Sequence, residues 1–249
     1  MKDLLSKEKD IIEYLEKEYK TTSTLKNKLC GIYKCYTLLN IESTLLKDKI
    51  ESYNITQAII EDKKNQEEKK PIEEADKVLE YFKDKLKEME QSLKHWDTKT
   101  QLYCILKIYL GYGVLRPSEI IDMKILDEDE GNENINYINI RTKKIIINKH
   151  KNDKNGPKII DIKCKKLLSQ LLKGYNKYLI YNSKCEKYND TSAFTKLFSR
   201  TFNNYTPYDL RKCISSKAIH EGDPEKIKML EYKQGHTLDT ILSYYDTYT

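Results

Sequence analysis

Several residue patterns that would point to other classes of protein are missing from this chain of 249 residues. Its six cysteines form no Cys-x-x-Cys pair and no cluster with histidine, which argues against a zinc site and favours reduced, buried thiols. No stretch is apolar enough to span a membrane, and the amino terminus is charged from Lys2 onward, without the apolar segment of a secretion signal. We therefore expect an intracellular protein of the cytoplasm or nucleus, with no metal, no other cofactor and no membrane partner.

A large excess of one charge is also missing. The chain has 45 Lys and Arg residues against 39 Asp and Glu, which gives a net charge of +6 and a pI of about 8.7. This is a mild value for a protein that binds nucleic acid, so the distribution of the charges matters more than their sum.

What the chain does contain is helical periodicity in two blocks. Residues 1–62 carry apolar side chains at helical spacing, and residues 63–71 form a charged stretch that is either a linker or a solvated helical extension. Residues 72–249 form the second block, with helices predicted at 72–93, 102–110, 164–181 and 193–202 and with Trp96 as a core anchor. Three short strands are predicted at 135–140, 144–148 and 158–162. The fold class is therefore mainly α with a small antiparallel β-sheet.

Two arginines stand near predicted helix starts, where an anion is favoured. Arg116 precedes Pro117, which suits the first helical position, and Glu119, which suits the first turn. Arg211 follows a similar start at Thr206-Pro207-Tyr208-Asp209. Backbone N–H groups and guanidinium groups together would bind a phosphate at such positions.

A histidine and a tyrosine near the carboxyl end complete an ordered set. His236 follows Gly235, a predicted helix C-cap, and Tyr245 comes nine residues later (245 − 236 = 9). Tyr244 is the alternative to Tyr245, and Tyr248 is a more remote one. Neighbouring helical residues differ in direction by about 100°, so Tyr244 and Tyr245 cannot both face one phosphate.

The ordered set resembles the tyrosine recombinase and phage integrase family, whose mechanism is related to that of type IB topoisomerases. The resemblance spans roughly 71–249. Leu115-Arg116-Pro117-Ser118-Glu119 is similar to the first arginine motif of the family, and Gln234-Gly235-His236 is similar to its Leu-Gly-His motif. The second arginine motif, His-x-x-Arg, is matched at Arg211 but has Tyr208 in the place of the histidine.

The resemblance implies a role for each residue. Arg116 and Arg211 would bind the phosphate, His236 and Tyr208 would donate further hydrogen bonds, and Tyr245 would form a covalent 3′-phosphotyrosyl link. Arginines at such a site stabilise the charge that develops on the non-bridging oxygens. Glu119 would support Arg116. In the family, a lysine on a β-hairpin protonates the leaving 5′ oxygen, and the resemblance assigns this role to Lys154, with Lys151 as the alternative.

The implied function is a site-specific recombinase or integrase that acts on double-stranded DNA without metal or ATP. The family places a small helical core-binding domain before the catalytic domain, which implies DNA-binding by residues 1–62. Assembly as a dimer or tetramer on DNA is implied as well, although only four residues follow Tyr245 (249 − 245 = 4). Abundant Lys, Asn, Ile and Tyr suggest an A+T-rich genome, that of a virus or mobile element, and a virus-infected host cell is the location that this origin implies. Two alternatives are a topoisomerase-like or telomere-resolvase-like strand transferase and a protein of the same fold that binds DNA without cleaving it.

Overall fold

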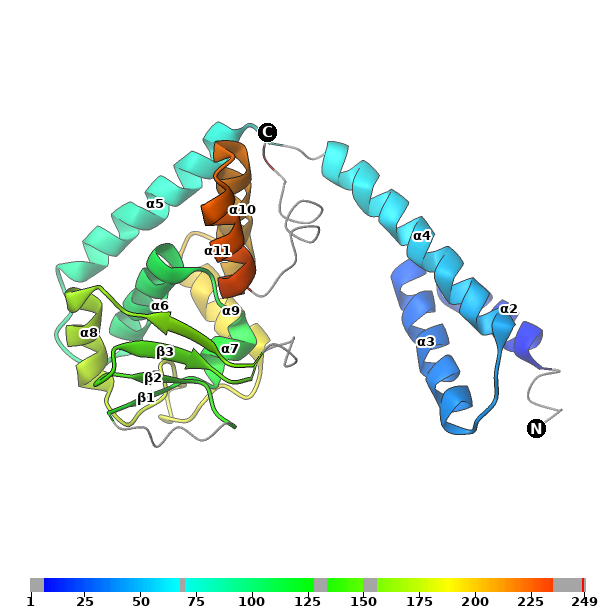
Figure 1. Cartoon of the computed structure of the whole chain (residues 1–249), viewed down its shortest axis with the longest axis horizontal. Helices are drawn as coiled ribbons and strands as arrows, with labels where there is room; N and C mark the ends of the chain where they lie inside the picture. The colour runs from blue at the N-terminus through cyan, green and yellow to red at the C-terminus, as the bar shows by residue number, and fades with distance from the viewer. Residues whose placement is uncertain (1–6, 68–69, 128–133, 150–155, 235–247, 249) are drawn as a thin grey trace. The chain divides into compact units, whose positions relative to one another are not determined.

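The computed structural model describes residues 7–67, 70–127, 134–149, 156–234 and 248. The chain divides into two compact units, Met1–Glu68 and Lys69–Thr249 (Figure 1). Each unit has a core of its own, and each is described by itself below.

The first unit consists of three helices, α2 (Glu8–Glu18), α3 (Thr22–Leu38) and α4 (Thr44–Glu67). Helix α3 packs against both α2 and α4. Leu29 of α3 and Leu46 of α4 are fully buried in the core of this unit. Helix α4 continues to Glu67, so the range 63–67 is helical where the sequence left a choice between a linker and a helical extension.

Helices form most of the second unit. Helix α5 packs against α6 and α10, while α9 contacts both α7 and α10. The bounds of these helices are α5 (Ile72–Glu90), α6 (Thr98–Tyr112), α7 (Pro117–Ile121), α8 (Lys165–Leu171), the 3₁₀ helix η2 (Leu172–Gly174), α9 (Thr191–Thr201), α10 (Pro207–Glu221) and α11 (Pro224–Gln234). The chain is thus mainly helical, as predicted.

The predicted helix at 164–181 is wrong in its second half. Helix α8 ends at Leu171, and η2 adds a single turn up to Gly174. A Cβ atom at Gly174 would lie within the contact distance of the Trp96 ring, so only glycine fits there. Asn176 then adopts a positive φ of 57°, and the chain runs on as an extended segment. The Ile125 amide donates to the Lys177 carbonyl, and the Leu179 amide donates to the carbonyl of Met123, just before the strand at 124–126. Tertiary pairing therefore overrides the helical pattern.

The sheet has four strands in the order β1-β2-β3-β4. They are β1 (Lys124–Leu126), β2 (Tyr137–Asn139), β3 (Lys144–Ile147) and β4 (Lys158–Asp161), and the last three lie within the predicted strands. Two of the pairings, β2 with β3 and β3 with β4, are antiparallel. The three predicted strands thus form the antiparallel part of the sheet, and β1, which the sequence did not predict, adds a fourth strand that pairs with β2 in parallel. Three residues are too short a strand to show an alternating pattern in the sequence.

An aromatic cluster joins α5 to α9 at the centre of the second unit. Phe82 is fully buried, and its ring centroid lies 6.1 Å from that of Phe198 and 5.6 Å from that of Phe202. Trp96 is also buried, which confirms its predicted place in the core. This packing holds α5, α9 and the sequence-distant α10 in one body, and it thereby positions the residues of the site.

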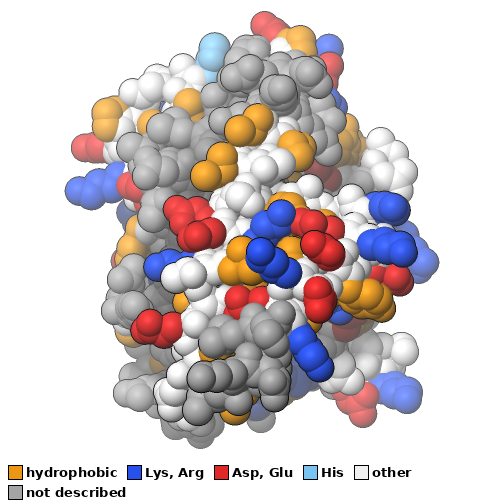
Figure 2. Space-filling view, turned by 90° about the vertical axis from the view of Figure 1, so that its right-hand side faces the viewer, with side chains coloured by type: hydrophobic (Ala, Val, Ile, Leu, Met, Phe, Trp, Pro, Cys, Tyr) orange, Lys and Arg blue, Asp and Glu red, His pale blue; other side chains and the backbone are white. Residues whose placement is uncertain are grey.

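The described helices include none with the length and apolar character that a membrane crossing requires. On the face of the molecule drawn in Figure 2, Lys and Arg side chains are interspersed with Asp and Glu side chains. The net positive charge therefore does not gather on that face as a patch of one sign.

Candidate functional site

Arg116 lies at the start of α7, in the position predicted from the sequence. It is the N-cap residue, and Pro117 follows at the first helical position. Glu119 is buried, with a side chain 1% exposed, and its Oε2 accepts a hydrogen bond from the Arg116 amide at 2.8 Å. Its Oε1 lies 3.3 Å from Nη1 of Arg116. Glu119 thus holds both the backbone and the guanidinium group of Arg116.

Arg211 reaches the same region from α10. The helix begins at Pro207 with a capping box, in which Thr206 and Asp209 exchange hydrogen bonds between side chain and backbone. Arg211 follows in the second turn and is only 6% exposed. Its Nη2 donates a hydrogen bond to the backbone carbonyl of Val114, two residues before Arg116. This bond connects the two arginine segments across 97 residues of sequence.

Lys158, for which the sequence predicted no role, lies next to Glu119, the partner of Arg116. It is the first residue of β4, and its side chain is 7% exposed. Its Nζ lies 3.5 Å from Oε1 of Glu119. The signal was present in the sequence, because Lys158 shares the inward face of the strand with Ile160, and the burial of β4 alternates accordingly. A lysine at an apolar strand position needs a partner, and this partner is Glu119.

Burial and the neighbouring charges shift the pKa of Lys158 in both directions. Burial lowers the pKa of the Lys158 amino group, and the positive charges of Arg116 and Arg211 lower it further. Glu119 acts in the opposite direction. Arg116 and Lys158 both contact the Glu119 carboxylate, and Arg211 lies near enough to lower the pKa of Lys158. These three cationic side chains and one carboxylate carry two net positive charges (3 − 1 = 2) when Lys158 is protonated. Such an arrangement favours a bound anion.

Helix α6 places Tyr109 close enough to the site for its charges to act on the phenol. Tyr109 is fully buried there, and burial raises the pKa of its hydroxyl group, with Arg211 and Glu119 both exerting an electrostatic effect on it. Tyr109 therefore stays a neutral phenol and contributes no charge to the site.

Tyr208 stands at the second position of α10 and is 49% exposed. The amino group of Lys212 lies 5.0 Å from the centre of its ring, within the range of a cation–π contact. An exposed phenol one turn before Arg211 can donate a hydrogen bond to a ligand, although at neutral pH it cannot act as a base.

The remaining predicted site residues lie outside the residues that the structure describes. They are Lys151, Lys154, His236, Tyr244 and Tyr245. Tyr248, the remote alternative, is described: its hydroxyl accepts a hydrogen bond from the Cys213 thiol on α10 at 3.5 Å. Burial and this contact raise the pKa of Tyr248, which makes its hydroxyl poorly suited to lose a proton and attack.

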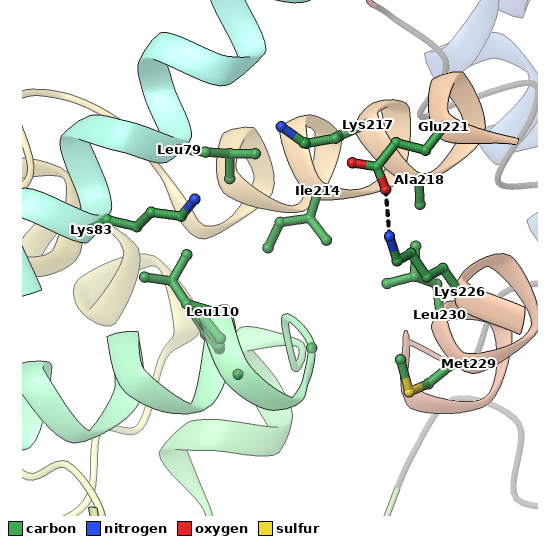
Figure 3. A pocket seen from close by; sticks show the side chains of 13 residues that line it. Leu79, Lys83, Leu110, Ile214, Lys217, Ala218, Glu221, Lys226, Met229 and Leu230 are labelled. Atoms are coloured by element: carbon green, nitrogen blue, oxygen red, sulfur yellow. Dashed lines mark hydrogen bonds and ion pairs between the residues drawn. The ribbon is translucent and has the colours of Figure 1, made fainter. Parts of the chain in front are cut away.

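A separate cavity of about 290 Å³ opens between α5, α6, α10 and α11 (Figure 3). Leu79, Leu110, Ile214 and Leu230 give it an apolar lining. At its edge, Lys226 pairs with Glu221 at 2.7 Å (Figure 3). The cavity lining is thus mainly apolar, unlike the site formed by Arg116, Glu119, Lys158 and Arg211, which we call the cationic site. Within the described ranges, no group of three or more His, Cys, Asp or Glu side chains is arranged to hold a metal ion.

Comparison with solved structures shows a distant structural likeness to a recombinase. A crystal structure of XerA recombinase matches 66% of this chain and 56% of its own length, with a TM-score of 0.43 and 17% sequence identity. No family model and no curated protein matches the chain. The chain thus corresponds to little more than half of the XerA chain.

Proposed function

We propose that this protein is a DNA strand transferase that cleaves and rejoins double-stranded DNA through a 3′-phosphotyrosyl intermediate. The observation that carries the proposal is the convergence of Arg116 and Arg211 on one buried region through the Val114 carbonyl. Two guanidinium groups held by buried partners are suited to one phosphodiester, because each can donate two hydrogen bonds to its oxygens.

In the proposed reaction, the Tyr245 hydroxyl gives its proton to His236 or to water and attacks the scissile phosphorus atom. A bond forms between phosphorus and the phenolic oxygen, and the bond to the 5′ oxygen breaks. The leaving oxygen takes a proton from Lys154, or from Lys151 in the alternative assignment. Arg116, Arg211, His236 and Tyr208 would stabilise the charge on the non-bridging oxygens. Rejoining reverses these steps, and no ATP is consumed because the phosphotyrosyl bond conserves the energy of the phosphodiester.

The biological role that we propose is integration or resolution of a viral or mobile genetic element, by a protein that assembles as a dimer or tetramer on its DNA. Residues 1–62 would serve as a DNA-binding domain and residues 72–249 as the catalytic domain.

The test is incubation of the protein with a nicked suicide oligonucleotide and with supercoiled DNA, without metal or ATP, followed by a denaturing gel. We expect a covalent protein–DNA band that is lost in Tyr245→Phe and retained in the matched control Tyr244→Phe. The reverse pattern would assign the reaction to Tyr244. If the wild-type protein binds its own target site but forms no covalent band, the result would instead support the second alternative, a protein that binds DNA without cleaving it. Relaxation of supercoiled DNA by a monomer would favour the topoisomerase-like alternative.

A further inference from the structure

Lys158 is buried at a point where its charge must be offset. The residue is 5% exposed, and its amino group lies next to Glu119 Oε1 at 3.5 Å. Removing an ammonium group from water is costly unless it gains a partner and hydrogen bonds. A buried lysine in a strand whose other inward positions are apolar therefore indicates a specific requirement for the positive charge.

The charges of the site suggest what this requirement is. Glu119 holds the amide and the guanidinium group of Arg116, and alone it would cancel one of the two guanidinium charges. Lys158 touches the same carboxylate oxygen that faces Nη1 of Arg116. With Lys158 protonated, the carboxylate is shared, and the positive charge of both arginines remains for an anion.

We propose that Lys158 is a positioning residue of this site: by pairing with Glu119, it allows the carboxylate to fix Arg116 while the site keeps two positive charges for a phosphodiester. This inference rests on the proposed function, and it adds a residue that acts through Glu119 and not on the leaving oxygen.

The charge of the Lys158 amino group, and with it the proposed activity, depends on pH. The groups that face Lys158 from the neighbouring elements are Glu119 and Arg116 of the α7 segment and Arg211 of α10. Because burial and the two arginines lower the pKa of Lys158, its charge is lost at a lower pH than that of an ordinary lysine. Rising pH therefore removes the positive charge of Lys158, and activity falls on the alkaline side. An arginine at position 158 would keep its charge throughout.

The first experiment measures the rate of covalent complex formation on the nicked oligonucleotide, with protein in excess, from pH 7 to pH 10. We expect Lys158→Met to lower the rate by at least about tenfold at pH 7.5, whereas Lys158→Arg retains most of it and shifts the alkaline fall to higher pH. Lys184→Met, which removes an exposed lysine from the loop before α9, is the control for the loss of one charge. A wild-type rate in Lys158→Met would overturn the proposal.

A double variant separates positioning from folding. Glu119→Gln combined with Lys158→Met removes both members of the pair and leaves no unpaired charge at either position. If Lys158 acts through Glu119, Lys158→Met lowers the cleavage rate far less in the Glu119→Gln background than in the wild type. Equal effects in both backgrounds would show that Lys158 acts independently of Glu119 and would contradict the proposal.

A measurement without DNA distinguishes this inference from the proposed function. Inorganic phosphate should raise the melting temperature of the wild-type protein relative to chloride at equal ionic strength, because binding to the folded state stabilises it. We expect Lys158→Met to lose this shift, and Lys158→Arg and Lys184→Met to keep it. If the shift depends on Lys158 while no covalent complex forms, the anion site stands and the strand-transfer function fails. An equal shift in all variants would refute the role of Lys158.

Discussion

Glu119 is the residue on which the cationic site depends. Its carboxylate accepts from the Arg116 amide and guanidinium group and from the Lys158 amino group, and it is almost fully buried. These donors come from the start of α7 and from β4, whereas Arg211 reaches the same region from α10. Its burial makes it a structural residue as well as a partner of the cationic groups.

We expect Glu119→Ala to lower the free energy of unfolding by about 3–5 kcal/mol, because removing one partner leaves buried cationic groups uncompensated. Urea denaturation followed by circular dichroism would measure the change. Glu80→Ala, at an exposed position of α5, serves as the control and should change stability by no more than about 0.5 kcal/mol. A loss of less than about 1 kcal/mol in Glu119→Ala would mean that water or other donors compensate the site.

At the scale of elements, the start of α10 determines where Tyr208 and Arg211 stand. The Thr206 hydroxyl accepts from the Asp209 amide at 3.2 Å, and Oδ2 of Asp209 accepts from the Thr206 amide at 2.8 Å. This reciprocal cap fixes the first turn, so both side chains start from a defined backbone.

Loss of this cap should weaken the helix start. We expect Thr206→Ala to lower the free energy of unfolding by about 1 kcal/mol, because an orphan amide of the first turn loses its acceptor. Thermal and urea denaturation would measure it. Ser169→Ala is the matched control, since Ser169 is exposed within α8 and its hydroxyl only donates to the Lys166 carbonyl of its own helix. Stability equal to that of the wild type in Thr206→Ala would show that the cap contributes little.

At the scale of the whole molecule, the two units have separate cores. Leu29 is fully buried in the core of the first unit, and Phe82 is fully buried in that of the second. No residue belongs to both clusters among the residues that the structure describes. A substitution that destabilises one core should therefore first increase local unfolding in its own unit.

Amide hydrogen exchange can test this division. We expect Leu29→Ala to cost about 2–5 kcal/mol and to speed exchange in α2, α3 and α4, with little change in α5 and α10. Phe82→Ala should cost about 3–5 kcal/mol and produce the opposite pattern. Faster exchange throughout the chain in either variant would mean that the two units unfold together.

Local signals in the sequence were sufficient for the parts of this protein that depend on neighbours along the chain. Helix α5, the start of α10 and the strands β2, β3 and β4 follow from apolar spacing, helix caps and turn residues, and these also placed Arg116 at a helix start. Such features are decided within a few residues, which is why they can be predicted from one chain.

By itself, then, the sequence determined the helical character, the two arginine segments and the order of the proposed catalytic residues. Only the tertiary structure decided that Arg211 bonds to Val114, that Lys158 pairs with Glu119 and that β1 adds a parallel strand. These contacts join residues 97 and 39 positions apart, and they exist because the packing of α5, α6, α9 and α10 brings their segments together. The partners of β1 and of Lys158 are not their neighbours in the sequence, so their roles depend on the tertiary fold.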